Sequence, residues 1–434
     1  MIQWAIFAIL ACGDERSSSQ SNESKPSVQE SSQESSQAEE LAEEQKAENI
    51  KIAYTPKVEP LMGSKRPALL VTQAWFHQSD SKKPIPGPAR LEIWRSDDKG
   101  VWGKTTIEDA DSNVFHKALP YEGGILTIGA EKALLKKWNF DDTTKSWKQD
   151  VLWERAWKGK IDRLRDIEIG DVDHDGKDEL VIATHDAGVV AVLHPDENYR
   201  VEELDEKADT FVHEIEIGDI DGDGKLEFFA TPTDRNKASA SQGGLMVMYQ
   251  YDGSSFQRTV VDPFGKTHAK EILTADITGD GVAELFSVVE AEAIGKTIVK
   301  PVQIRQYTKT DTGFQHNIIA TIQDRQTRFL VAGDFDQDGA IELVAAAMRS
   351  GLWLLDPQKD GTFATTLIEK NSSGFEHTTY GADMDGDGKL ELYVAADEQG
   401  ELHQYIWNGS GFTKHTIGEI PKRTITWNIT TGEL

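Results

Sequence analysis

The chain has 434 residues, a formal net charge of −28 and a single cysteine. So acidic a chain is repelled by phosphate backbones, which argues against nucleic acid as a partner. One cysteine excludes disulfides within the chain.

The N-terminal segment MIQWAIFAILA is apolar and ends directly before Cys12. It is similar to a bacterial lipoprotein signal, in which cleavage leaves a lipidated cysteine at the new N-terminus, although it is short and has no Lys or Arg at its start. We therefore expect residues 1–11 to be a signal peptide. Cys12 would carry the lipid and hold the protein in the bacterial cell envelope, at the outer membrane or the cell surface.

Residues 12–60 are dominated by Ser, Gln and Glu and contain almost no aromatic side chains. Such a segment cannot bury enough apolar surface to offset the entropy lost on ordering. The composition predicts a disordered acidic stalk that links the lipid anchor to a folded domain at residues 61–434.

Residues 67–108 and 114–153 each contain several short runs rich in β-branched and aromatic residues, which predicts two β units, the first of them without its inner strand. In the second unit the first hairpin shrinks to the sequence YEGG at 121–124. Neither unit contains an acidic loop.

Five copies of the pattern D-x-D-x-D-G-x-x-E follow, each between two strand-like runs and about 50 residues from the next, a spacing that suits one four-stranded propeller blade per copy. The copies read DVDHDGKDE from Asp171, DIDGDGKLE from Asp219, DITGDGVAE from Asp276, DFDQDGAIE from Asp334 and DMDGDGKLE from Asp383. They predict blades at about 160–204, 211–261, 268–320, 325–369 and 375–417.

Each copy offers the oxygen ligands that Ca²⁺ prefers. Carboxylates at positions 1, 3 and 5 converge if the chain turns sharply, and the glycine at position 6 permits that turn. Position 7 supplies a main-chain carbonyl, and the Glu at position 9 closes the ligand shell. The third copy is the weakest, because Thr278 replaces the carboxylate at position 3. The predicted ligands are Asp171, Asp173, Asp175, Lys177 and Glu179; Asp219, Asp221, Asp223, Lys225 and Glu227; Asp276, Thr278, Asp280, Val282 and Glu284; Asp334, Asp336, Asp338, Ala340 and Glu342; and Asp383, Asp385, Asp387, Lys389 and Glu391.

These loops resemble the calcium loops of the FG-GAP/VCBS-repeat family, whose best-known relatives are the β-propeller heads of integrin α subunits. The match holds at positions 1, 3, 5 and 9, and it covers roughly residues 60–434, most clearly from residue 160. The last ligand here is Glu, where the family often has Asp. The resemblance implies a propeller with up to five Ca²⁺ ions and no single activity.

The expected fold is therefore all-β, a propeller of seven blades, with six or eight left open because the first two units are degenerate. The first unit lacks an inner strand, whereas residues 423–429 look like an inner strand with nothing after it. We expect this C-terminal segment to complete the first blade and close the ring.

A basic or imidazole side chain lies six residues before each motif, at Arg165, His213, Lys270, Arg328 and His377. His116 holds the matching place in the second unit, and Lys422 or Arg423 in the closing strand. Equal offsets place these residues on a circle, which predicts a ring of positive groups at one mouth of the central channel. Because His lies near its pKa, anion binding there is expected to strengthen from about pH 8 to pH 6.

Two functions remain open. The ring could bind an anionic glycan or protein ligand, or it could pair with neighbouring carboxylates and serve only the fold. We favour a calcium-stabilised binding propeller over an enzyme, since no catalytic constellation can be named. The alternative is a polysaccharide lyase or sugar dehydratase, with His213 or His377 as base and Arg165 or Arg328 neutralising a substrate carboxylate.

Overall fold

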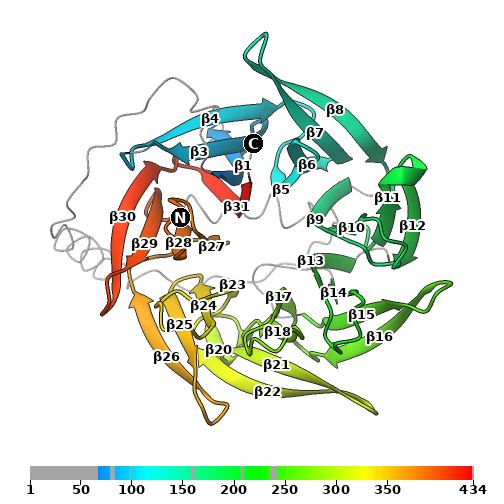
Figure 1. Cartoon of the computed structure of the whole chain (residues 1–434), viewed down its shortest axis with the longest axis vertical. Helices are drawn as coiled ribbons and strands as arrows, with labels where there is room; N and C mark the ends of the chain where they lie inside the picture. The colour runs from blue at the N-terminus through cyan, green and yellow to red at the C-terminus, as the bar shows by residue number, and fades with distance from the viewer. Residues whose placement is uncertain are drawn as a thin grey trace, which may run out of the picture.

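The computed structural model describes residues 67–78, 84–97, 99–157, 162–205, 207, 210–234 and 242–432. In these ranges the chain is built from strands arranged around a central axis as a β-propeller (Figure 1). The described part contains one helix, a 3₁₀ turn at Pro195–Glu197, and no helix there is long and apolar enough to cross a membrane. The predicted signal peptide, Cys12 and the acidic stalk lie outside the described residues.

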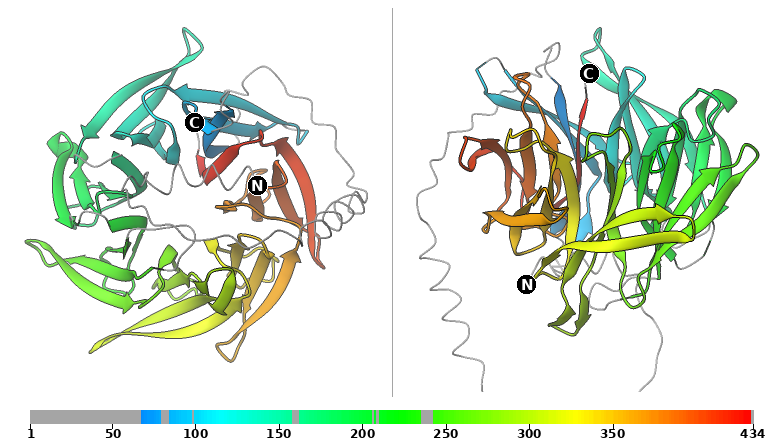
Figure 2. Two further views of the ribbon diagram at one scale, coloured as in Figure 1. Left: turned by 180° about the vertical axis from the view of Figure 1, so that it is seen from behind. Right: turned by 60° about the horizontal axis from the view of Figure 1, so that its bottom comes forward.

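The first sheet is completed by the C-terminal strand. Its members are β1 (Ala68–Gln78), β2 (Pro84–Pro86), β3 (Ala89–Ser96), β4 (Trp102–Asp109) and β31 (Thr424–Gly432). β31 pairs antiparallel with β1 from Ala68↔Gly432 to Trp75↔Thr424. Figure 2 shows this strand beside the N-terminal strands, so the two ends of the propeller sequence share one sheet.

An eight-stranded sheet follows. It contains β5 (Phe115–Tyr121), β6 (Gly124–Glu131), β7 (Ala133–Asp141), β8 (Ser146–Arg155), β9 (Asp162–Gly170), β10 (Glu179–Thr184), β11 (Val190–His194) and β12 (Arg200–Asp205). Its halves, β5–β8 and β9–β12, are joined where Ala130 and Glu131 of β6 pair with Arg163 and Asp162 of β9.

Four four-stranded sheets continue around the axis. They are β13 (Thr210–Gly218), β14 (Glu227–Asp234), β15 (Leu245–Tyr251) and β16 (Phe256–Pro263); β17 (Ala269–Ala275), β18 (Glu284–Val289), β21 (Val302–Thr310) and β22 (Gly313–Ile322); β23 (Thr327–Gly333), β24 (Glu342–Ala347), β25 (Gly351–Pro357) and β26 (Phe363–Glu369); and β27 (Thr379–Ala382), β28 (Glu391–Ala396), β29 (Glu401–Trp407) and β30 (Phe412–Glu419). A separate hairpin, β19 (Glu292–Ile294) and β20 (Thr297–Lys300), projects between β18 and β21.

The core lies between neighbouring sheets. The second strands, such as β10 with the sequence ELVIAT and β24 with ELVAAA, are buried along their whole length, because both of their faces are covered. The cluster that contains Leu69 and Trp94 also contains Tyr393 and Leu402, so the first sheet packs against the last and the ring is closed.

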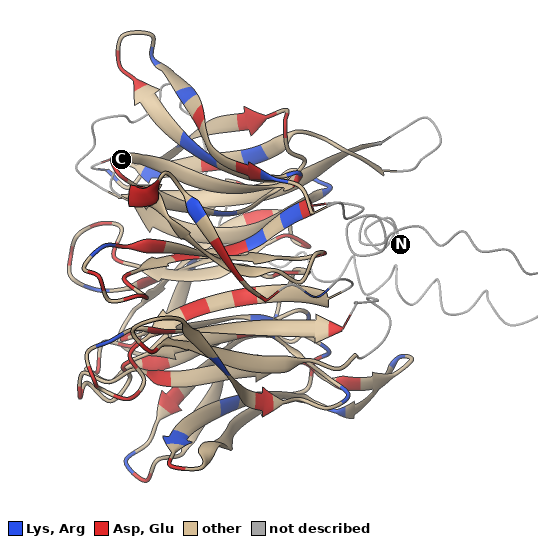
Figure 3. Ribbon diagram, turned by 90° about the vertical axis from the view of Figure 1, so that its right-hand side faces the viewer, with Lys and Arg blue, Asp and Glu red and all other residues tan. Residues whose placement is uncertain are grey.

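The innermost strands end at the acidic loops, and several end in glycine. A Cβ at Gly218 would lie 2.8 Å from the Cβ of Thr274 in the next sheet. Because Gly218 has no side chain, the second and third acidic loops can come close together. The N–H of Ala283 in the third loop donates to the carbonyl of Asp219 in the second over 2.9 Å. The five loops therefore lie at one face of the propeller, where the ribbon in Figure 3 is coloured red at many Asp and Glu residues.

Candidate functional site

The five acidic loops share one main-chain conformation. In each copy the N–H of position 7 donates to the position 5 carboxylate, over 2.8–3.0 Å. In each copy the N–H of position 2 donates to the Glu at position 9, as from Phe335 to Glu342 over 2.8 Å. The position 6 glycines have φ between 79° and 92°, the left-handed region that the sharp turn requires.

The loop carboxylates converge to different degrees. In the fourth and fifth copies all four carboxylates offer an oxygen within 4.8 Å of one another, and in the second copy Asp219, Asp221 and Glu227 do so. The third copy's carboxylates form no such group among the described residues. There Thr278 donates its hydroxyl to Glu284 over 3.2 Å.

These carboxylates fit a divalent cation. Asp334 Oδ1 and Glu342 Oε1 are buried and lack a hydrogen-bond partner among the described residues. Burial, reinforced by repulsion from Asp336, raises the pKa of Glu342 to about 7. A cation with oxygen ligands would satisfy these atoms and offset the repulsion, so the clusters could hold metal ions.

The basic ring residues occupy β-bulges in the innermost strands. The pairing register shifts at His116 of β5, at Arg165 of β9, at His213 and Glu214 of β13, at Lys270 of β17 and at Arg328 of β23. A bulge adds a residue to one strand and turns its side chain away from strict alternation. This explains how Arg165 and its neighbour Asp166 can both contact groups on other inner strands.

The closing strand contributes a different residue from the one predicted. The register of β31 shifts at Trp427, which therefore holds the bulge position. Its ring centroid lies 4.8 Å from that of His116 and 5.1 Å from the guanidinium carbon of Arg165. The prediction of Lys422 or Arg423 was wrong, because that segment has no acidic motif from which to count. His377 precedes β27 and has a left-handed φ of 55°.

The ring residues do not line an open channel mouth, which corrects that expectation. Their exposed fractions run from 0% for His377 to 8% for Arg165. Arg165 lies 3.8 Å from Glu376, which comes from the opposite side of the ring, and Glu376 also pairs with Arg328. The two arginines of the ring are thus paired with carboxylates inside the propeller.

Two of the three ring imidazoles, those of His116 and His377, contact main-chain or hydroxyl groups, whereas the buried Nε2 of His213 has no hydrogen-bond partner among the described residues. His116 Nδ1 lies 2.7 Å from the carbonyl oxygen of Leu164. His377 lies 2.6 Å from the carbonyl oxygen of Ala347 and 2.7 Å from the hydroxyl of Ser372. These contacts and their burial favour a role in the fold.

Burial also changes which ring group titrates near neutral pH. It lowers the pKa of His377 to about 4, and it lowers the pKa values of His116 and His213 well below the usual range. Burial, followed by repulsion from Arg328, lowers the pKa of Lys270 to about 7. Among these groups it is therefore Lys270, and not the histidines, whose charge changes between pH 6 and pH 8.

A second, acidic layer lies one residue further along the inner strands. Asp166 accepts the N–H of Ile215 over 2.7 Å, and Glu271 accepts the N–H of Leu330 over 3.0 Å, so each carboxylate links its own sheet to the next. Lys117 of β5 pairs with Asp166 at 3.0 Å. These pairs connect neighbouring inner strands around the axis.

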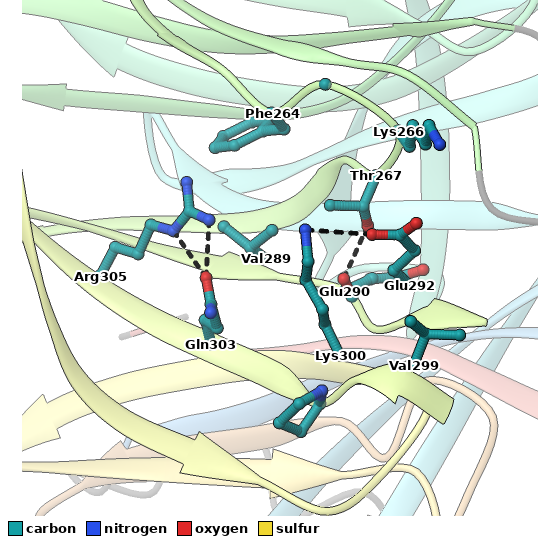
Figure 4. A pocket seen from close by; sticks show the side chains of 12 residues that line it. Phe264, Lys266, Thr267, Val289, Glu290, Glu292, Val299, Lys300, Gln303 and Arg305 are labelled. Carbon is teal, nitrogen blue, oxygen red and sulfur yellow. Dashed lines mark hydrogen bonds and ion pairs between the residues drawn. The ribbon is translucent and has the colours of Figure 1, made fainter. Parts of the chain in front are cut away.

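Open pockets lie beside the β19–β20 hairpin. One, of about 410 Å³, is lined by Lys266, Lys300 and Arg305 together with Glu290 and Glu292 (Figure 4). In it Lys300 pairs with Glu292 at 3.1 Å.

The other pocket, of about 660 Å³, contains Lys296, Arg325 and Arg349 and one acidic residue, Asp324. Asp324 accepts the N–H groups of Arg349 and Ser350, each over 2.7 Å. Sequence reasoning missed both pockets, because their residues come from connections that carry no repeated motif.

Comparison with known proteins identifies the repeat. Residues 334–394, which contain the fourth and fifth acidic loops, match the FG-GAP-like repeat family. This match and the propeller arrangement of the strands support an FG-GAP β-propeller family for this chain. No curated protein sequence matches this FG-GAP propeller.

Solved structures similar to this FG-GAP propeller share its fold. A putative 6-phosphogluconolactonase from Bacteroides fragilis matches with a TM-score of 0.54 at 11% identity, covering 86% of this chain and 100% of that one. A putative 6-phosphogluconolactonase from Bacteroides uniformis matches with a TM-score of 0.54 at 12% identity, over 85% and 99%. A protein from Lactobacillus plantarum matches with a TM-score of 0.55 at 10% identity, over 85% and 100%. Identities this low relate the folds alone.

Proposed function

We propose that this FG-GAP propeller is a calcium-stabilised, seven-bladed binding module for an anionic ligand on a glycan or a protein. The blade count follows if β31 completes the first sheet and if the eight-stranded sheet counts as two blades, since its halves share two residue pairs. The four remaining four-stranded sheets bring the total to seven.

Calcium is the proposed ion for the acidic loops. Oxygen ligands in a flexible loop suit Ca²⁺ better than Mg²⁺, which requires near-ideal octahedral geometry. The common hydrogen-bond pattern of the five loops and the unpartnered oxygens of Asp334 and Glu342 support this assignment. The ions would hold together the first hairpin of each blade.

The observation that carries the binding proposal is the gathering of cationic side chains beside the β19–β20 hairpin. This hairpin connects the second and third strands of its sheet, so it lies at the face opposite the acidic loops. The two pockets that flank it are lined by six cations and three carboxylates, in a chain whose net charge is −28. A local positive surface on an acidic protein attracts anionic groups selectively.

The burial of the ring favours binding over the alternative lyase or dehydratase. A general base must come within about 3 Å of the substrate proton. His213 and His377 are buried, and the ring arginines are already paired with carboxylates. The pockets beside β19–β20 are therefore the better candidate site.

Charge reversal tests the binding site. We expect the double variant Lys296→Glu/Arg349→Glu to lose binding to uronate-containing glycans on an array, with calcium present. Lys145→Glu/Lys359→Glu serves as the control, because it makes the same change of charge at turns on the loop face. Equal binding by both variants, or no uronate binding by the native protein, would contradict the proposal.

We also propose that Cys12 anchors the propeller in the bacterial envelope through a lipid. The support is the apolar sequence before this cysteine and the long polar segment after it. The anchor would leave the propeller free to reach a ligand outside the membrane.

A further inference from the structure

The first acidic loop differs from the other four because a histidine faces it. His194 ends β11, one residue beyond the pairing of Leu193 with Leu180, and this register places it opposite Glu179. Its side chain is 4% exposed. Asp173, Glu179 and His194 form a group whose possible metal-ligating atoms all lie within 4.8 Å of one another.

The imidazole lies near three carboxylates and has no hydrogen bond to any of them. Its Nδ1 faces Asp173 and Glu179, and its Nε2 lies 3.8 Å from Oε2 of Glu202. His194 Nδ1 lies 3.7 Å from Asp173 Oδ2 and 3.6 Å from Glu179 Oε1, beyond the roughly 3.2 Å limit of a hydrogen bond. Its Nε2 is buried and has no hydrogen-bond partner among the described residues. Two ligands bound to one ion by bonds of about 2.1 Å are separated by about 3.0–3.6 Å. The observed spacing therefore leaves room for an ion between the three side chains.

The matching position in other loops holds a different residue. In the second loop it is Gln250, one residue beyond the pairing of Tyr249 with Phe228. Gln250 donates its amide to Glu227 over 2.8 Å, so that this carboxylate already has a partner. The fourth and fifth loops gather four carboxylates and no nitrogen ligand.

Imidazole nitrogen changes which metal a carboxylate site prefers. Ca²⁺ takes oxygen ligands, whereas imidazole suits Zn²⁺ and other first-row transition ions. Affinity for sites with nitrogen and oxygen ligands rises from Mn²⁺ toward Cu²⁺, with Zn²⁺ well above Mn²⁺. A site with one nitrogen and two or more carboxylates therefore discriminates against Ca²⁺.

We propose that the first loop binds a transition-metal ion, Zn²⁺ among the common ones, through Asp173, Glu179 and His194, while the other loops take Ca²⁺. The proposal rests on the cation-binding function proposed for the loops. It gives this propeller two classes of metal site, related by the repeat and distinguished by one side chain.

The test uses the full-length protein freed of metal and then titrated with Zn²⁺ in millimolar Ca²⁺, with bound metals counted by elemental analysis. We expect one Zn²⁺ that Ca²⁺ does not displace. His194→Gln introduces the residue that the second loop has at this position. It should lower the Zn²⁺ affinity of the first loop by at least about tenfold, the smaller effect seen when a residue that supports a metal is lost. The calcium-dependent rise in Tm should remain. Co²⁺ titration should show visible absorption bands in the native protein and not in the variant.

A gain-of-function variant guards against misfolding of His194→Gln. Gln250→His in the native background should create a second site that retains Zn²⁺ in Ca²⁺. Unchanged Zn²⁺ retention in His194→Gln would overturn the proposal while leaving the calcium loops intact. Failure of every loop to bind any cation would instead contradict the proposed function itself.

Discussion

The buried position of Lys270 disfavours its positive charge, although the protein as a whole is acidic. Lys270 lies in a bulge of β17 near Arg328, Arg165 and His213, with Glu290 and Glu376 as the nearby carboxylates. Burial and like charge outweigh the two carboxylates, so its pKa falls to about 7. An unfolded Lys keeps a pKa near 10.4. Between about pH 7 and pH 10 the unfolded chain thus binds the extra proton, and this residue's contribution to stability rises with pH.

Substitution of Lys270 by Met removes that dependence. We expect Lys270→Met to be more stable than the native protein at pH 6.5, by on the order of 2 kcal/mol, because a buried charge is lost. The advantage should shrink by pH 9.5, where native Lys270 is neutral in the folded protein and increasingly neutral in the unfolded one. Urea unfolding of the variant and of the native protein at pH 6.5 and at pH 9.5 measures the difference in unfolding free energy at each pH. A pH-independent difference would show that Lys270 stays charged when buried.

At the scale of the element, the loop and the hairpin that carries it form one unit. The position 9 Glu starts the second strand and its carboxylate accepts the N–H of position 2, so that closing the ion site also fixes the hairpin. The third loop has Thr278 in place of a carboxylate, and its acidic residues do not gather as those of the fourth and fifth loops do. Loop affinity should therefore follow carboxylate number.

Two substitutions test this relation. Asp383→Ala should remove one bound Ca²⁺ and lower Tm by a few degrees, because four carboxylates there converge. Thr278→Asp should strengthen calcium binding by the third loop, since it restores the missing ligand. Isothermal titration of each variant, compared with the native protein, reports the number and affinity of the ions. If Thr278→Asp left both unchanged, position 3 would not be a ligand.

The positions of the acidic loops could be predicted from the sequence, because five copies repeat nearly the same residues at the same spacing. It could not predict the bulges, since the register of an inner strand depends on its partner strand and the packing around the axis. Counting six residues back found Arg165 and Arg328, yet the partner that buries both, Glu376, comes from another blade. His194 was missed for the same reason: it is 23 residues after Asp171 and meets the loop only through strand pairing.

At the scale of the whole molecule, stability should depend on calcium and on pH together. Burial raises the pKa values of Glu179, Glu227 and Glu342 to about 7, above the usual value near 4.3. Groups with a raised pKa in the folded state stabilise it at low pH, and this stabilisation is lost as pH rises through about 7. Above that pH the loops are fully charged and need the cation most.

Chelation should therefore lower Tm more at pH 8 than at pH 5.5. At pH 5.5 protons on the loop carboxylates already reduce their repulsion and calcium must displace them, so bound calcium adds less stability. At pH 8 the carboxylates are charged, and calcium relieves their full repulsion. Thermal unfolding in calcium and in excess chelator, at pH 5.5 and at pH 8, gives the four Tm values that this comparison needs. Equal losses at the two pH values would mean that the loop Glu residues are not protonated in the calcium-free protein.

The proposed membrane anchor predicts a simple change of location. Cys12→Ser should move the protein from the membrane fraction to the soluble fraction of expressing bacteria, because the lipid attachment atom is lost. Mass spectrometry of native material should show a lipidated chain that starts at Cys12. An unmodified chain that starts at Met1 would contradict the prediction.

The pairing of β31 with β1 has a consequence for how the protein folds. The hydroxyl of Thr72 donates to the carbonyl of Asn428, 356 positions away along the chain. Contacts between residues so far apart cost closure entropy before they return any stabilisation, and they slow folding. We expect the blades that pair only within themselves to form early and ring closure to be the slow kinetic step. Until that step, the edge of β1 is open to pairing with other chains, which makes the partly folded protein most prone to aggregate just before it is complete.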